Sequence, residues 1–168
     1  MKCPFCGHKN ITGDDQCESC NQNLSSLDGV TPKSEIEKVL MSDPITSLPP
    51  HRAVFASPDS NVLEIVELMN QGKTGAVVIV KNDELQGIVT ERDITLKVVS
   101  EEKDPFQVLA KTIMTSDPQT LSEDDTLAYA VNLMSVRNFR HLPVLNGKKV
   151  IGIISIRDVI KHLSKLFP

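Results

Sequence analysis

The sequence predicts a mixed α/β (α+β) protein in which a small cysteine-rich unit precedes two copies of a β-α-β-β-α unit. All four cysteines lie within the first 20 residues. Residues 56–98 align with residues 121–163 at a constant offset of 65 and without a gap, with nine identical positions. Because one copy of this size cannot bury its own apolar surface, we expect the two copies to pack together with pseudo-two-fold symmetry.

Composition and charge narrow the possible functions. The formal net charge is −4, which disfavours sequence-independent attraction to nucleic acid or to an anionic membrane surface. No apolar run approaches the roughly 18 residues that span a bilayer. The N-terminal MKCPFC lacks the apolar stretch of a secretory signal, so we expect a cytoplasmic protein without a membrane segment.

The cysteines form two CxxC pairs, Cys3 with Cys6 and Cys17 with Cys20, separated by ten residues. Each pair makes a tight turn that directs both sulfur atoms to one point, and two such turns supply the four ligands of a tetrahedral structural zinc. Two disulfides are disfavoured in a reducing cytoplasm, and a redox dithiol would not need a second pair. We predict that metal binding supplies the folding free energy of this short segment.

Residues 1–26 resemble the short zinc ribbons of bacterial and archaeal N-termini, in which CPxCG precedes a second CxxC and a polar stretch that ends here in Leu24. Some ribbons of this kind bind nucleic acid, but acidic residues outnumber lysines here and four thiolates add negative charge. We therefore expect a protein-docking or spacing role, with His8 as a solvated loop residue. An iron-binding, electron-carrying ribbon is the alternative.

A linker and a short helix follow at residues 27–46, then the first copy at 47–105 and the second at 106–168. Ser34 is the predicted N-cap of the helix, and Glu37 would complete its capping box. Four prolines between positions 44 and 58 exclude a long helix there.

Each copy reads as a helix, a strand, a turn, a strand and a second helix. Asn146-Gly147 predicts a type I′ hairpin turn, which we place opposite Asn82-Asp83 of the first copy. The strands are nearly continuous apolar runs, so both sheet faces should be covered. The predicted helices are 61–70 and 126–135, and the predicted strands are 76–80, 85–90, 142–145 and 150–155.

This order of elements resembles a tandem CBS-domain pair, also called a Bateman module, over residues 35–168. The resemblance rests on GIVTERD at 87–93, GIISIRD at 152–158, Met114-Thr115 and HLPV at 141–144. It implies a regulatory, non-catalytic protein that binds an adenosine-containing ligand such as AMP, ADP or ATP between the copies. It also implies a homodimer.

GIVTERD at 87–93 and GIISIRD at 152–158, which we call the repeated phrase, have a local explanation and a functional one. Thr90 and Ser155 should cap the following helices, with Asp93 and Asp158 completing capping boxes. Capping does not explain the arginine in each phrase, because a cation in the first turn faces the positive end of the helix dipole.

A bound phosphate would offset that cost, and each aspartate is suited to ribose hydroxyls. Arg92 and Arg157 are the arginines of the two phrases, and they carry the local case for an anionic ligand. The resemblance assigns ligand-binding roles to the threonine or serine and the aspartate of each phrase.

The second copy has Arg140 and His141 where the first has Gly75 and Ala76. The resemblance places a basic side chain there to reach ligand phosphates, so we expect two unequal sites. A solvated Arg140 and a neutral, packed His141 are the alternatives. We expect His51 and His162 to be surface residues.

No nucleophile elbow, P-loop or carboxylate-histidine pattern indicates an enzyme. Three function classes stay open: a nucleotide-sensing module with an unnamed protein partner, a zinc-ribbon nucleic-acid or transcription accessory protein, and a ligand-free dimeric adaptor.

Overall fold

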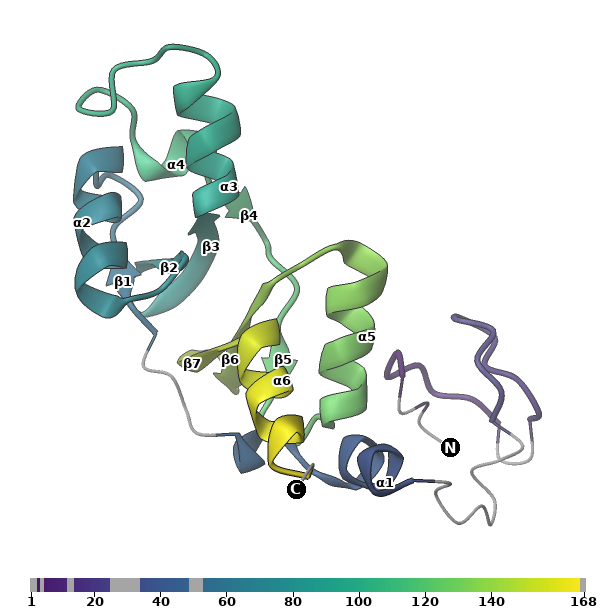
Figure 1. Ribbon diagram of the computed structural model, residues 1–168. Coiled ribbons are helices and arrows are strands. Elements are labelled where there is room, and N and C mark those ends of the chain that lie inside the picture. Colours follow the sequence, from purple (N-terminus) through teal and green to yellow (C-terminus); the bar gives the residue numbers. More distant parts are fainter. Residues whose placement is uncertain (1–2, 4, 12–13, 25–33, 49–52, 167–168) are drawn as a thin grey trace. The chain divides into compact units, whose positions relative to one another are not determined.

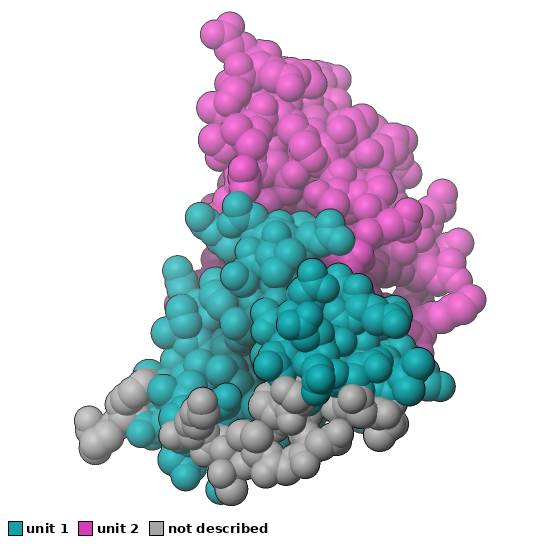
Figure 2. All heavy atoms as spheres, turned by 90° about the vertical axis from the view of Figure 1, so that its right-hand side faces the viewer, with its two compact units in different colours: residues 1–50, 121–142, 154–168 teal, residues 51–120, 143–153 magenta. Residues whose placement is uncertain are grey.

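A computed structural model shows the mixed α/β architecture that the sequence predicts (Figure 1). The chain divides into two compact units, which Figure 2 colours separately. We call residues 51–120 with 143–153 the first-copy unit, and residues 1–50 with 121–142 and 154–168 the second-copy unit. The structure describes residues 3, 5–11, 14–24, 34–48 and 53–166. Residues 25–33, which contain the first part of the predicted linker, and His51 lie outside them.

The first-copy unit is built on a four-stranded sheet with the strand order β1-β2-β3-β4. Strand β2 pairs parallel with β1 and antiparallel with β3, and β3 pairs antiparallel with β4. The strands are β1 (Phe55–Ala56), β2 (Ala76–Lys81), β3 (Glu84–Thr90) and β4 (Thr115–Ser116), and the helices are α2 (Val62–Gly72), α3 (Glu91–Ile94) and α4 (Ala110–Ile113).

Strand β2 is covered on both faces, as its apolar sequence predicts. Val77 and Ile79 lie in one core cluster with residues of α2 and α4. Ala76 and Val78, which alternate with them, lie in a second cluster with Val150 and Ile153 of the second copy. A hairpin of the second copy therefore completes the core of the first-copy unit.

The second-copy unit joins the second repeat to the chain that precedes the first repeat. The backbone N–H of Ile45 donates to the Asp125 carbonyl at 2.8 Å, and that of Leu127 donates to the Asp43 carbonyl at 3.0 Å. A three-stranded sheet has the order β5-β6-β7. The elements of this unit are α1 (Glu35–Ser42), η1 (Ile45–Ser47), β5 (Leu121–Ser122), α5 (Leu127–Arg137), α6 (Ile156–Leu163) and η3 (Ser164–Leu166). Strands β6 (His141–Asn146) and β7 (Lys149–Ser155) lie mostly within residues 143–153, which belong to the first-copy unit.

The predicted helix starts are confirmed. Ser34 caps α1 by accepting from the backbone N–H of Glu37 at 3.2 Å. Asn61 caps α2, and Thr126 caps α5 at the equivalent position of the second copy.

One of the two hairpin turns differs from the prediction in its register. In the first copy, Asn82 and Asp83 both have positive φ, as a type I′ turn requires. In the second copy the turn lies one residue later than predicted, because β6 ends at Asn146 and β7 begins at Lys149. Only Gly147 has positive φ there, at +60°, so the type I′ prediction for Asn146-Gly147 is wrong.

The second helix of each copy also differs. In the second copy, α6 is a regular helix over residues 156–163. In the first copy, α3 ends at Ile94 and continues as a π-helical segment, η2 (Thr95–Val99), in which the N–H of Ser100 donates to the Thr95 carbonyl at 2.9 Å. An ungapped repeat in the sequence thus carries two different helical geometries.

Gly87 has a packing role that predicts the effect of its replacement. A Cβ atom at this position would lie 2.7 Å from the Thr115 carbonyl oxygen and 2.8 Å from the Met114 sulfur. We expect Gly87→Ala to lower the free energy of unfolding by about 1–3 kcal/mol, as overpacking does. Urea denaturation measures the change.

Gly147→Asn is the matched control. No atom lies within 4 Å of a Cβ built at Gly147, and asparagine tolerates its φ of +60°. The control should stay within about 0.5 kcal/mol of the wild type. Equal losses in the two variants would contradict the close approach of β4 to β3.

Candidate functional site

The four cysteines lie on two turns with the same hydrogen-bond pattern. In the first turn, the N–H of Cys3 donates to the His8 carbonyl at 2.8 Å and the N–H of Gly7 donates to the Cys3 carbonyl at 2.9 Å. In the second, Cys17, Asn21 and Gln22 repeat these two bonds, each at 2.8 Å. Gly7 and Asn21 both have positive φ, which lets each chain fold back past its CxxC pair.

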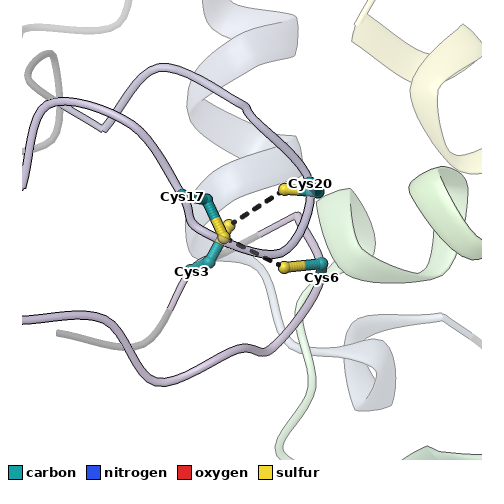
Figure 3. Close-up of side chains that lie close together, drawn as sticks. All are labelled: Cys3, Cys6, Cys17 and Cys20. Atoms are coloured by element: carbon teal, nitrogen blue, oxygen red, sulfur yellow. Dashed lines mark hydrogen bonds between the residues drawn. The ribbon is translucent and has the colours of Figure 1, made fainter.

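The four sulfur atoms point toward one another (Figure 3). The Sγ atoms of Cys3 and Cys20 are 3.7 Å apart, those of Cys6 and Cys17 are 3.4 Å apart, and all four lie within 4.8 Å of one another. Sulfur atoms around a tetrahedral zinc with bonds of about 2.3 Å lie about 3.8 Å apart. The donor set and its spacing therefore fit a four-thiolate metal ion.

The pKa values of the cysteine thiols differ within the cluster. Burial raises the pKa of Cys3, and burial with the neighbouring sulfur atoms raises the pKa of Cys20 to about 12. Burial also acts to raise the pKa of Cys17, but hydrogen bonds from the backbone of Cys20 and Ser19 and from side chains outweigh it and lower the value to about 6. A positive ion at their centre would stabilise the thiolate forms of four sulfur atoms so close together.

The apolar core around these cysteines is small. Cys3, Cys17 and Leu24 are buried and form one cluster, against which Phe5 packs in part. Leu24, which the sequence marks as the end of the segment, is fully buried. A core of this size cannot stabilise a fold alone, so metal coordination would have to supply most of the stability.

The predicted capping boxes are present in both copies. In the first, the Oδ2 atom of Asp93 accepts from the N–H of Thr90 at 3.0 Å and from its hydroxyl at 2.6 Å. In the second, Oδ2 of Asp158 accepts from the N–H of Ser155 at 2.8 Å and from its hydroxyl at 2.6 Å. Each phrase thus places one carboxylate against the first turn of its helix.

The basic residues of the two phrases are exposed. Arg92 and Arg157 lie on the surface, and no ion pair involves either of them within the described part of the chain. Arg140 is also exposed, and its carbonyl accepts the N–H of Ile156 at 3.0 Å, which places it beside the start of α6. His141 is half-buried at the start of β6.

Two features were not predicted from the sequence. Lys97 donates to Oδ1 of Asp93 at 2.8 Å, a helical i, i+4 pair that its spacing could have indicated. His162, predicted to be a surface residue, is only 19% exposed, and its Nε2 lies 3.4 Å from Oδ2 of Asp43. That prediction is wrong because Asp43, which precedes the first repeat and is far from His162 in sequence, lies against its ring.

None of the helices in the described ranges combines the length and apolar character that crossing a bilayer requires.

Comparison with known proteins identifies the repeated region. A family model described as "CBS domain" matches residues 36–100 and 110–165. An uncharacterised protein of Methanopyrus kandleri is 39% identical over 110 residues, which cover 64% of this chain and 56% of that protein. The chain thus spans little more than half the length of that relative.

Solved structures give the same fold. A CBS-domain protein from Agrobacterium tumefaciens is 31% identical, with a TM-score of 0.63 and coverage of 67% of this chain and 90% of that one. A CBS-domain pair in complex with 5′-methylthioadenosine and S-adenosyl-L-methionine is 22% identical, with a TM-score of 0.67 and coverage of 73% and 97%.

The capping role of Ser155 predicts a stability effect that needs no ligand. Ser155→Ala removes a hydroxyl that bonds Asp158 and should lower the free energy of unfolding by about 0.5–2 kcal/mol. Ser116→Ala, at an exposed position of β4, is the control, and we expect a change within about 0.5 kcal/mol. Chemical denaturation of both variants tests this, and an unchanged Ser155→Ala would contradict the capping role.

Proposed function

The chain belongs to the CBS-domain family as a tandem pair, and we propose that it is a regulatory, non-catalytic module. In this proposal it binds an adenosine-containing ligand between the copies, with AMP, ADP and ATP as the first candidates, and transmits ligand occupancy to a protein partner. The observation that carries the proposal is the repeated phrase itself, in which a hydroxyl and a carboxylate are fixed at a helix start beside an exposed arginine.

Each group has a chemical role in this proposal. At an occupied copy, Asp93 or Asp158 accepts hydrogen bonds from ribose hydroxyls, and Thr90 or Ser155 contacts phosphate together with the helix N–H groups. Arg92, Arg157, Arg140 and His141 supply positive charge to the phosphates. The solved pair with bound adenosine compounds supports the fold alone at 22% identity, so the ligand class rests on the phrase.

We propose a structural Zn²⁺ held by Cys3, Cys6, Cys17 and Cys20, with iron as the alternative. The zinc would neutralise the crowded thiolates and fix the two turns, and it would take no part in a reaction. In this proposal the ribbon docks a partner, because its described residues include three acids, Asp14, Asp15 and Glu18, and one lysine, Lys9. That charge disfavours phosphate backbones.

A cytoplasmic homodimer completes the proposal. Cys3, Cys6, Cys17 and Cys20 form no disulfide with one another, which suits a reducing compartment. Apolar side chains such as Leu96, Val99 and Ile160 are more than half exposed on the second helices of the two copies, where a partner copy could cover them.

Ligand binding predicts a thermal shift and a heat of binding. We expect at least one of AMP, ADP, ATP and S-adenosylmethionine to raise the melting temperature of the full chain. The stabilisation should reach about 2.7 kcal/mol at a ligand concentration 100 times Kd. Scanning fluorimetry and isothermal titration calorimetry measure the two effects.

The double variant Asp93→Asn, Asp158→Asn should lose this response. Asp117→Asn is a matched control, because Asp117 is exposed and its φ of +47° suits asparagine. No shift and no heat with any of the four ligands would reject nucleotide sensing in favour of a ligand-free adaptor.

The cysteine cluster predicts one zinc per chain, measured by elemental analysis of purified protein. Cys17→Ser should lose the zinc and leave residues 3–24 sensitive to proteolysis, while His8→Ala, outside the cluster, should retain it. Because protons compete with metal for thiolates, zinc affinity should fall as the pH is lowered. Visible absorbance from bound iron, or equal retention in Cys17→Ser, would contradict the assignment.

A further inference from the structure

The two copies present the same capping box in different electrostatic surroundings. In the first copy both carboxylate oxygens of Asp93 are engaged by the protein. Oδ2 accepts two bonds from Thr90, and Oδ1 accepts the ammonium of Lys97 at 2.8 Å. The Asp93 side chain is only 13% exposed, so little of the carboxylate faces solvent.

Lys97 is itself held from a second side. Its ammonium also donates to the backbone carbonyl of Ile113, a residue that is 1% exposed. Moving Lys97 aside would leave that buried carbonyl without this donor, which is costly. The lysine lies in the π-helical segment η2, which has no counterpart in α6 of the second copy.

The phosphate side of the first copy carries a negative charge. The N–H of Glu91 donates to the Gly75 carbonyl at 3.1 Å, and a Cβ built at Gly75 would lie 3.0 Å from the Glu91 carboxylate. The carboxylate therefore lies against the backbone at the start of α3. An anion approaching this helix start meets a like charge.

The second copy replaces these groups. Ile156 donates its N–H to the Arg140 carbonyl at 3.0 Å, the same bond that joins Glu91 to Gly75, so the four positions are structurally equivalent. The second copy has Arg140 in place of Gly75 and Ile156 in place of Glu91. The net charge of these two positions is therefore more positive by two in the second copy. At the position of Lys97 the second copy has His162, whose Nε2 faces Asp43.

We propose that Lys97 and Glu91 close the first copy to phosphorylated nucleosides, so that the chain binds one such nucleotide, at the second copy. Lys97 supplies Asp93 with the partner that a ribose would otherwise provide, and Glu91 repels the phosphate. The inference rests on the proposed nucleotide-binding function and assigns it to one of the two copies.

Matched aspartate variants test the assignment by calorimetry with AMP on the zinc-loaded full chain. We expect the wild type to bind one AMP per chain. Asp158→Asn should weaken binding by about tenfold or more, whereas Asp93→Asn should leave Kd within about twofold. Asparagine keeps an acceptor oxygen for the capping box in both variants, so the folds are comparable.

Replacing three first-copy residues by their second-copy equivalents tests whether they close the first copy. The triple variant Gly75→Arg, Glu91→Ile, Lys97→His gives the first copy the residues of the second and should bind two AMP per chain. Gly75 accepts a side chain because its φ is not positive and its close neighbour is the Glu91 side chain, which the variant also removes. Glu101→Gln, which removes an exposed carboxylate of the same unit and changes the net charge by +1 as the triple variant does, is the charge control and should bind one.

The outcomes separate the two proposals. Two AMP per wild-type chain, loss of binding in Asp93→Asn, or a triple variant that folds and still binds one AMP would overturn the closure of the first copy and leave nucleotide sensing in place. An absence of AMP binding in the wild type and in the triple variant would overturn both.

Discussion

Strand β2 must be covered on both faces, and the rest of the architecture depends on how that is done. Val77 and Ile79 meet helices of their own copy, whereas Ala76 and Val78 meet Val150 and Ile153 of the other. A single copy would leave the second face of β2 exposed to water. Each valine or isoleucine that is exposed instead of buried costs about 1.5–3 kcal/mol of folding free energy. The fold therefore requires both copies of the repeat, whatever their function. Any ligand site formed by the repeated phrase depends on a fold that needs both copies.

The capping boxes limit what the repeated aspartates alone can say about function. Asp93 and Asp158 each accept two short bonds from the residue three positions earlier, and a helix start would favour an acid there without any ligand. The same bonds also hold the carboxylates rigid, which lowers the entropy lost on binding. Discrimination between ligands must then come from the groups around each box, where Arg140 and Ile156 in one copy replace Gly75 and Glu91 in the other.

The sequence was sufficient for features set by local chemistry and by exact repetition. The N-cap at Ser34, both capping boxes and the cysteine turns follow from residue type and spacing, and the structure contains them. It was insufficient where contacts join distant segments. Burial of His162 against Asp43 depends on chain far from α6, and the π-helical segment at Thr95–Val99 arises although the repeat has no insertion. The turn at Gly147 was misplaced because strand register, set by cross-strand pairing, decided its position.

Stability and charge can vary independently at the two helix starts. The capping bonds use only the hydroxyl, one carboxylate oxygen and backbone groups, and the Glu91-to-Gly75 and Ile156-to-Arg140 bonds are also made by backbone atoms. Glu91 and Arg140 are exposed, so exchanging their side chains alters the field at the helix start without disturbing those bonds. A duplicated module can thus keep two identical folding elements while one copy carries an acid, Glu91, and an aspartate paired with Lys97, and the other carries an arginine, Arg140. The two copies therefore differ at positions whose side chains contribute little to folding, and we expect any functional difference between the copies to arise at those positions.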